Sequence, residues 1–333
     1  MYETFFGLTG KPFQLNPDPA FFYGSRGHKR AFAYLQYGVH QGEGFIIITG
    51  DVGAGKTTLV RSLIEQIDPN QFVAAQLVTT QLDAEDLLRS VAMAFGLPTR
   101  ALDKAQLLAE LEAFFVSLVP QGKHALLIVD EAQNLSSRAI EELRMLSNFQ
   151  LGNQGLLQSF LVGQPELRQL MQGPELQQLR QRVTASYHLG PMDRAETQAY
   201  VEHRLRHVGW RNDPHFEPGA FDAIYTFSAG IPRRINTLCN RLLLAAALSE
   251  EHNFTAASVD ATADEIRLEL SAGSSSAAVT SGPTNGNGFD DGEAIGLEER
   301  VVSLERVMTA TLDLLQQMRR SQAPLKPFDP LQK

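Results

Sequence analysis

Eight residues that follow an apolar run have the types and spacing of a phosphate-binding loop. They fit the pattern G-x-x-x-x-G-K-[ST] and read Gly50, Asp51, Val52, Gly53, Ala54, Gly55, Lys56 and Thr57. The apolar residues 45–48 precede the loop, and apolar residues at helical spacing follow it over 59–67. Because the motif requires this strand–loop–helix context, we interpret it as the Walker A element of a nucleotide site.

The residue types of this loop suit a nucleoside triphosphate. The glycines let successive backbone N–H groups face phosphate oxygens at the positive end of the following helix. We expect Lys56 to reach the β- and γ-phosphates, Thr57 to coordinate magnesium, and Thr58 to contact the nucleotide. The predicted cofactors are therefore ATP and Mg2+.

Two adjacent carboxylates, Asp130 and Glu131, follow the apolar residues 125–129. Side chains at successive strand positions point in opposite directions, so the two carboxylates cannot do the same job. We predict a Walker B element in which Asp130 holds the magnesium through water and Glu131 orients and deprotonates the attacking water. Hydrolysis would then depend on Glu131. The alternative is a solvated acidic pair at the end of a strand.

Further polar residues are candidates for contact with the transferred phosphoryl group. Gln164 follows an apolar run and is expected near the γ-phosphate, or else is a turn residue before a helix at Pro165. Arg233 opens a later helix and is expected to face the phosphates of its own subunit. Arg180 or Arg182, just before the last strand, would reach the nucleotide of a neighbouring subunit in an oligomer. Each arginine could instead be a solvated or salt-bridged surface residue.

Short apolar runs alternate with helical patterns over residues 1–190, which we assign to the nucleotide-binding core. That alternation is typical of a parallel sheet with helices on both faces, and so of an α/β fold. Helical patterns lie between the strands, for example at 83–95 and 137–149. The five strands are expected at residues 45–49, 72–78, 124–130, 156–162 and 183–189.

Beyond the core, the strands are expected to stop. Residues 191–270 form a predicted helical lid, with helices at 194–207, 218–228, 232–250 and 256–270. Residues 271–292 carry almost no large apolar side chains and are expected to be a flexible linker. In residues 293–320 apolar residues recur at steps of four and three, which predicts an amphipathic helix with a coiled-coil seam. It could self-associate, dock a partner or pack on its own domain, and residues 321–333 form an extended tail.

Composition limits the classes of partner and the compartment. The net charge of -9 disfavours a broad electrostatic grip on nucleic acid or anionic lipid, so protein partners are favoured and DNA is not excluded. Cys239 is the single cysteine, which rules out an intramolecular disulfide and suits a reducing cytoplasm. We find no signal-peptide pattern and no apolar run of the roughly 18 residues that a membrane span needs.

Several motifs together resemble the A-type general secretion pathway ATPases over residue 1 to about 270. Besides the phosphate-binding loop, the matching segments are Phe6-Gly7-Leu8, Pro12-Phe13, Pro17-Asp18-Pro19, Asp130-Glu131-Ala132-Gln133, Leu146-Ser147-Asn148, Gly163-Gln164-Pro165-Glu166-Leu167, Leu179-Arg180-Gln181-Arg182 and Gly230-Ile231-Pro232-Arg233. Within that group, residues 10–19 and the segment Gly24-Ser25-Arg26-Gly27-His28 most resemble the ATPase associated with exosortase (PEP-CTERM) protein sorting and exopolysaccharide loci.

This resemblance implies a two-subdomain AAA+ fold, hydrolysis of ATP with magnesium, and a homo-oligomer. It also implies a role in a Gram-negative envelope export system, from the cytoplasm or attached to the inner membrane through a partner. The secretion members carry a membrane span and a peptidoglycan-binding region after the ATPase, whereas here a linker and a heptad helix follow, so direct contact with the cell wall is not expected. The family also resembles ATPases that assist transposition, which leaves an ATP-switched DNA-binding adaptor as the alternative function.

Overall fold

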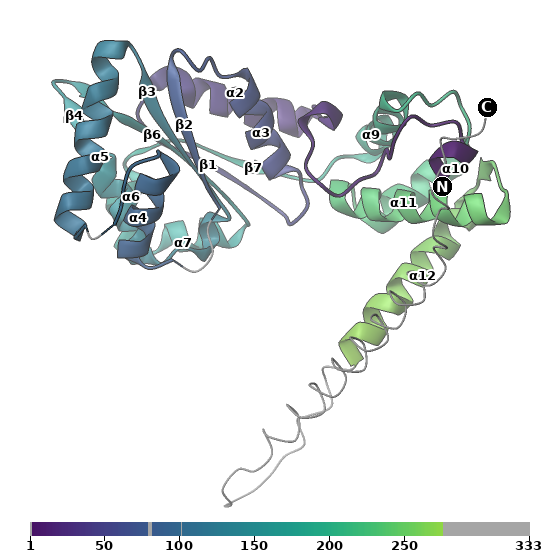
Figure 1. Cartoon of the computed structure of the whole chain (residues 1–333). Coiled ribbons are helices and arrows are strands. Elements are labelled where there is room, and N and C mark those ends of the chain that lie inside the picture. The colour runs from purple at the N-terminus through teal and green to yellow at the C-terminus, as the bar shows by residue number, and fades with distance from the viewer. Residues whose placement is uncertain (1, 79–81, 101, 276–333) are drawn as a thin grey trace, which may run out of the picture. The chain divides into compact units, whose positions relative to one another are not determined.

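The computed structural model describes residues 2–78, 82–100 and 102–275, with side chains described as far as residue 269 (Figure 1). Most of the predicted linker, the predicted heptad helix at 293–320 and the tail at 321–333 lie outside the described residues. Among the helices that are described, none has the length and apolar character needed to cross a membrane.

A five-stranded sheet with the strand order β2-β3-β6-β1-β7 organises the first part of the chain. Neighbouring strands all run parallel, which confirms the predicted α/β fold. Four strands keep their predicted positions within a residue at either end, and β6 lies one residue later than expected. The strands are β1 (Gly44–Gly50), β2 (Phe72–Val78), β3 (His124–Asp130), β6 (Leu157–Gly163) and β7 (Val183–Leu189).

The two faces of the sheet are covered by different helices, because successive side chains of a strand point to opposite sides. Ile46 and Ile48 of β1 pack with α2 (Arg26–Gln41) and α3 (Lys56–Gln66). Phe45 and Ile47 belong to the larger cluster on the other face. Full burial of each such side chain contributes about 1.5–3 kcal/mol. The helices of that second face are α4 (Ala84–Ala94), α5 (Lys104–Leu118), α6 (Ser137–Leu146) and α7 (Glu166–Gln172).

The lid contains four helices at the predicted places: α9 (Arg194–His207), α10 (Pro218–Ser228), α11 (Pro232–Ser249) and α12 (Ala256–Ser275). Two expectations were wrong in detail. The strands do not stop at the lid, because β8 (His215–Phe216) and β9 (Asn253–Phe254) pair in parallel. Strands of two residues are too short to show any periodicity in the sequence. The helix expected to end at residue 270 continues to Ser275, into the segment that we predicted to be linker.

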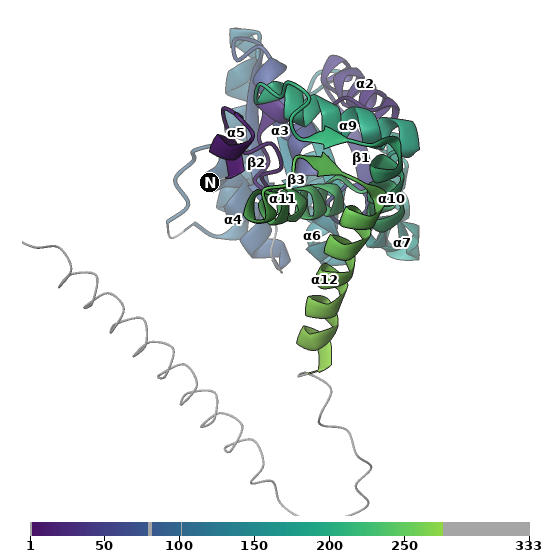
Figure 2. The same ribbon diagram turned by 90° about the vertical axis from the view of Figure 1, so that its right-hand side faces the viewer.

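The first residues of the chain pack with the lid, although the sequence grouped them with the core. Tyr2, Phe6 and Phe13 are buried in the same cluster as Leu238 of α11. The Tyr2 hydroxyl also donates a hydrogen bond of 2.8 Å to Asn240 Oδ1. Figure 2 shows the short N-terminal helix α1 (Tyr2–Phe5) beside α11. The chain therefore starts on the lid and must pass between lid and sheet before it enters α2.

The remaining elements are short. They are η1 (Pro19–Phe21), η2 (Val119–Gln121), η3 (Ala132–Asn134), β4 (Gln150–Leu151), β5 (Gln154–Gly155), η4 (Pro174–Leu176) and α8 (Gln177–Arg180). β4 and β5 form an antiparallel pair outside the main sheet.

Candidate nucleotide site

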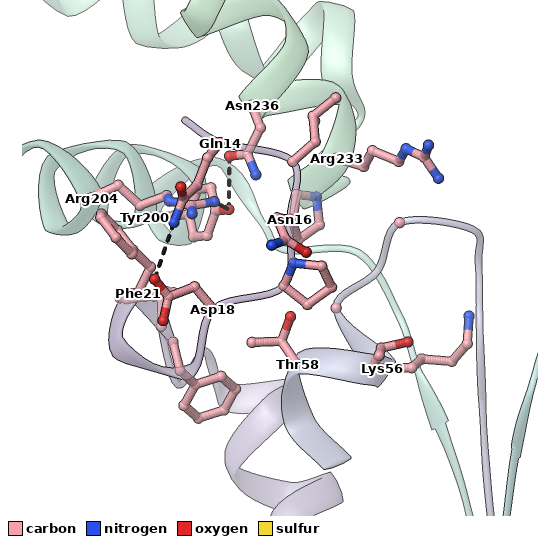
Figure 3. A pocket seen from close by; sticks show the side chains of 18 of the residues that line it. Gln14, Asn16, Asp18, Phe21, Lys56, Thr58, Tyr200, Arg204, Arg233 and Asn236 are labelled. Carbon is pink, nitrogen blue, oxygen red and sulfur yellow. Dashed lines mark hydrogen bonds between the residues drawn. The ribbon is translucent and has the colours of Figure 1, made fainter. Parts of the chain in front are cut away.

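A cavity of about 300 Å³ lies where the phosphate-binding loop, the segment 14–23 and the lid meet (Figure 3). The loop and α3 contribute Val52, Gly53, Gly55, Lys56, Thr57 and Thr58 to its wall. The lid contributes Tyr200, Arg204, Pro232, Arg233 and Asn236, and Glu131 follows β3. Four stretches that are far apart in the sequence therefore form one site.

The loop joins the end of β1 at Gly50 to the start of α3 at Lys56. Gly53 and Gly55 have φ of 81° and 95°, in the left-handed region that a side chain disfavours. Gly50, Asp51 and Ala54 do not line the cavity, and they act through their backbone instead. The Gly50 and Asp51 carbonyls accept hydrogen bonds from Lys56, and the Ala54 N–H donates to the Asp51 carbonyl over 3.1 Å.

Lys56 is buried behind the loop, with 6% of its surface exposed. Its Nζ atom donates to the Gly50 carbonyl over 2.7 Å and to the Asp51 carbonyl over 3.0 Å. Burial lowers the pKa of this ammonium, and the nearby carboxylates of Glu131 and Asp130 act against that effect. The positive charge of Lys56 is thus held beside the loop. When a nucleotide binds, its phosphate oxygens would replace the Gly50 and Asp51 carbonyls as partners of the ammonium.

The two predicted magnesium ligands lie together. Thr57 Oγ1 donates to Asp130 Oδ2 over 2.9 Å, and the Glu131 N–H donates to Asp130 Oδ1 over 3.0 Å. Asp130 is almost fully buried, and burial raises its pKa, although the bond from Thr57 opposes that shift. A hydroxyl and a carboxylate at this spacing fit Mg2+, which commonly takes one or two protein oxygens and completes its shell with water and substrate phosphates.

Glu131 is held in place by two amides. Its Oε2 atom accepts hydrogen bonds from Gln133 Nε2 over 2.6 Å and from Gln164 Nε2 over 3.2 Å. The Gln164 N–H in turn donates to Gln133 Oε1 over 2.9 Å. Burial acts to raise the pKa of Glu131, but the two amide bonds and the charge of Lys56 outweigh it, so the net pKa is lowered. The carboxylate therefore stays ionised near neutral pH, as a general base must.

Gln164 thus contacts Glu131, the candidate general base, and its place near the γ-phosphate stays a prediction. The sequence analysis missed Gln133 as a site residue, although the segment Asp130-Glu131-Ala132-Gln133 contains it. The signal was available, because a glutamine two residues after the catalytic candidate, in a turn, can reach back to that carboxylate.

Arg233 reaches the cavity from the start of α11. Its backbone N–H donates to the Gly53 carbonyl over 3.1 Å, which joins the lid directly to the phosphate-binding loop. Within the described part of the chain, its guanidinium has no hydrogen-bond or ion-pair partner in the protein. Figure 3 shows the guanidinium extending toward the side of the cavity where Lys56 lies. This placement suits a positive group for the phosphates of the same subunit.

Arg180 and Arg182 do not line the cavity of their own subunit. Arg180 Nη1 donates to the carbonyls of Met171 and Gly173 over 2.6 and 2.7 Å, at the end of α7. Arg182 Nη1 donates to the Ser147 carbonyl over 2.8 Å, at the end of α6. Both side chains satisfy carbonyls that a helix end leaves open. A role of either arginine at a neighbouring subunit stays a prediction.

Two further groups of cavity residues were missed as such by the sequence analysis. His28 is 5% exposed, and its Nε2 atom lies 3.0 Å from the Ala54 carbonyl. At the far side of the cavity from Lys56 (Figure 3), Arg204 Nη1 donates to the Tyr200 hydroxyl over 2.7 Å, and that hydroxyl donates to Asn236 Oδ1 over 2.8 Å. The Arg204 guanidinium also lies 5.0 Å from the centre of the Phe21 ring.

Comparison with known proteins supports this picture. Residues 39–171 match the family described as AAA domain. Over 267 residues the chain is 39% identical to general secretion pathway protein A of Aeromonas hydrophila, a match that covers 80% of this chain and 48% of that protein. The chain therefore spans about half the length of this relative. The narrower resemblance to exosortase-associated ATPases is not addressed by these matches and stays a prediction.

Solved structures show the same fold at low sequence identity. The ORC2 protein of Aeropyrum pernix in ADPNP–ADP complexes gives a TM-score of 0.58 at 19% identity, over 77% of this chain and 71% of that one. Drosophila ORC bound to DNA gives 0.55 at 20% identity, over 72% and 60%. Such identities speak for the fold alone. The chain thus has the AAA+ P-loop fold, with residues 39–171 matching the AAA domain, and it is similar over most of its length to general secretion pathway protein A.

Proposed function

We propose that this protein binds ATP with magnesium and hydrolyses it to ADP and phosphate. The observation that carries the proposal is the junction of three groups at the end of the sheet. Thr57 and Asp130 lie within 2.9 Å of each other, Lys56 is buried beside them, and Glu131 is kept ionised by its amide partners. A structural acidic pair would need neither a buried lysine nor a second carboxylate with a lowered pKa.

Each residue has a distinct task in this reaction. Lys56 and the N–H groups of the loop bind the β- and γ-phosphates, and Thr57 with Asp130 would hold magnesium. The metal, when bound, offsets phosphate charge. Glu131 accepts the proton of the attacking water, and Gln164 keeps that carboxylate oriented. Arg233 offsets the negative charge of the transferred phosphoryl group from the lid.

We further propose that turnover energises or regulates a Gram-negative envelope export or assembly system, such as exosortase-linked protein sorting, exopolysaccharide export or secretion. The similarity to general secretion pathway protein A supports this assignment. The protein would act as a homo-oligomer in the cytoplasm or at the inner membrane through a partner.

Phosphate release from ATP and magnesium tests the catalytic proposal. Glu131→Gln should bind ATP normally and lose turnover by about 10²–10⁴-fold, the usual contribution of a general base. Lys56→Ala should lose binding itself. Arg233→Ala should slow turnover while Arg234→Ala, its exposed neighbour outside the cavity, should not. Normal phosphate release by Glu131→Gln would refute the assignment of the base.

Phosphate release in the presence of duplex DNA, together with a DNA mobility-shift assay, separates the export function from the DNA adaptor. Duplex DNA at low salt should neither bind the protein in the presence of ATP nor stimulate phosphate release. A salt-dependent shift of the duplex that requires ATP would favour the adaptor and count against the export proposal.

A further inference from the structure

The segment Gly24-Ser25-Arg26-Gly27-His28 contributes to the family resemblance of the sequence but has no part in the chemistry proposed above. In the structure it forms the first turn of α2, with Ser25 as the N-cap. One side of this turn contacts the phosphate-binding loop, and the other side contacts the start of α9 in the lid. The turn therefore lies between the two parts that form the nucleotide cavity.

His28 makes the contact with the loop. Its Nε2 atom lies 3.0 Å from the Ala54 carbonyl, and its Nδ1 atom lies 2.7 Å from Ser25 Oγ. A carbonyl can only accept, so Nε2 carries the hydrogen and Nδ1 accepts from the serine hydroxyl. A Cβ atom at Gly55 would lie 2.8 Å from Nε2, so the imidazole is packed directly against the loop backbone. The loop and the first turn of α2 are thus held together as one body.

Glu196 makes the contact with the lid. Its Oε1 atom accepts from the Arg26 N–H over 2.7 Å and from Arg26 Nε over 3.2 Å. Its Oε2 atom accepts from the Asp193 N–H over 3.3 Å, in the capping box that opens α9. One carboxylate therefore accepts N–H groups from the ends of two helices, where the helix dipoles attract negative charge. The Arg26 guanidinium also pairs with Asp193.

We propose that Glu196 is a positioning residue that fixes the lid against the phosphate-binding loop and thereby places Arg233 at the phosphates. This inference rests on the proposed ATP hydrolysis. The lid has two ties to the loop, at adjacent carbonyls. Arg233 N–H is bonded to Gly53 directly, and α9 is joined to Ala54 through Glu196, Arg26 and His28. Loss of Glu196 leaves only the exposed Arg26–Asp193 pair in the second tie, so the start of α9 is held less firmly and Arg233 is less well fixed.

The decisive measurement is a double-mutant comparison of turnover. Glu196→Ala should lower kcat about tenfold and leave the dissociation constant of ADP within about threefold, because the loop itself is unchanged. In the Arg233→Ala background the same substitution should have no further effect on kcat. A residue with a merely structural role would slow both backgrounds by the same factor, and that result would overturn the inference.

Two further variants serve as controls for the double-mutant comparison. Glu202→Ala, on the same helix and paired with Arg206 at the surface, is the matched control and should behave as the wild type. Glu196→Gln keeps an oxygen for the Arg26 N–H and should retain more activity than alanine, and it replaces the alanine variant if that one fails to fold. An effect of Glu202→Ala equal to that of Glu196→Ala would contradict the proposal.

Amide hydrogen exchange at Arg233 reports the lid contact without any turnover, because this N–H is bonded to the Gly53 carbonyl. We expect exchange about tenfold faster in Glu196→Ala and unchanged in Glu202→Ala. Wild-type protein without ATPase activity would refute the proposed function alone, whereas unchanged exchange in Glu196→Ala would refute the positioning role alone.

Discussion

Replacement of Gly53 by alanine tests the contact between loop and lid most directly. Gly53 has φ of 81°, and a Cβ atom there would lie 2.3 Å from Arg233 Cβ. The left-handed backbone costs alanine about 1–2 kcal/mol. The clash forces the start of α11 away and breaks the hydrogen bond from the Arg233 N–H to the Gly53 carbonyl, a further 0.5–1.5 kcal/mol, roughly. We expect a loss of about 1.5–3.5 kcal/mol in the free energy of unfolding.

Gly122→Ala is the matched control for backbone strain. Gly122 has φ of 67°, and a Cβ atom there would meet nothing within 4 Å. The Gly122→Ala variant should therefore have the cost of the left-handed backbone but no steric clash. The difference between the two variants measures the lid contact, and at about 2–4 °C for each kcal/mol it is visible in Tm by circular dichroism.

Phosphate release completes this test. Gly53→Ala should also lower kcat, because the displaced helix carries Arg233, whereas Gly122→Ala should leave kcat unchanged. Equal Tm values for the two variants together with wild-type turnover in Gly53→Ala would refute the claim that this loop residue positions the lid.

Three further predictions concern Asp130, Glu131 and Cys239, whose pKa values are shifted in the folded protein. Asp130→Asn should abolish magnesium-dependent turnover yet raise Tm by about 2 °C near pH 8. Burial raises the pKa of Asp130 in the folded protein, so ionisation of this carboxyl lowers stability as the pH rises above about 4. The gain in Tm of the asparagine variant should therefore shrink as the pH is lowered toward about 4. Gln133→Leu should move the acid limb of the kcat–pH profile to higher pH with unchanged ATP affinity, because Glu131 loses a bond that lowers its pKa; an unshifted limb would contradict the clamp. Burial raises the pKa of the Cys239 thiol, so a thiol-reactive dye should label the native protein about 100-fold more slowly than the unfolded chain, and equal rates would contradict its burial.

The sequence was sufficient for the elements that carry a periodic or motif signal. The central strands β1 and β3 are almost continuous apolar runs because both of their faces are buried, and such runs have clear ends. The edge strand β7 is only partly buried, and its residues alternate between exposed and partly buried positions. The loop at Gly50 to Thr57 and the pair Asp130 and Glu131 lie at strand ends, so their meeting at one edge of a parallel sheet followed from the fold class. α5 was not assigned from the sequence, although Asp103 and Gln106 form a capping box at its start.

The parts that escaped prediction depend on contacts between distant segments. Glu196 and Arg26 are 170 residues apart, and nothing local in either segment indicates that they meet. The N-terminal aromatic residues are equally compatible with either hydrophobic core until the chain path is known. The contacts of Arg180 and Arg182 within the chain were not predicted either, since their guanidinium groups bind helix-end carbonyls, and their role at a neighbouring subunit stays a prediction. Polar residues acquire their roles from partners that periodicity does not reveal.

The division of labour within the site also indicates which part limits the reaction. The groups that come from the sheet are already close together: Thr57 bonds to Asp130, and Glu131 bonds to Gln164. They lie at or just beyond the ends of the adjacent strands β1, β3 and β6, so little reorganisation is needed for them to act. Arg233 is different, because it belongs to the lid and depends on the Gly53 and Glu196 ties for its position. Substitutions that loosen the lid should therefore affect kcat more than nucleotide affinity, whereas substitutions in the loop should affect affinity first.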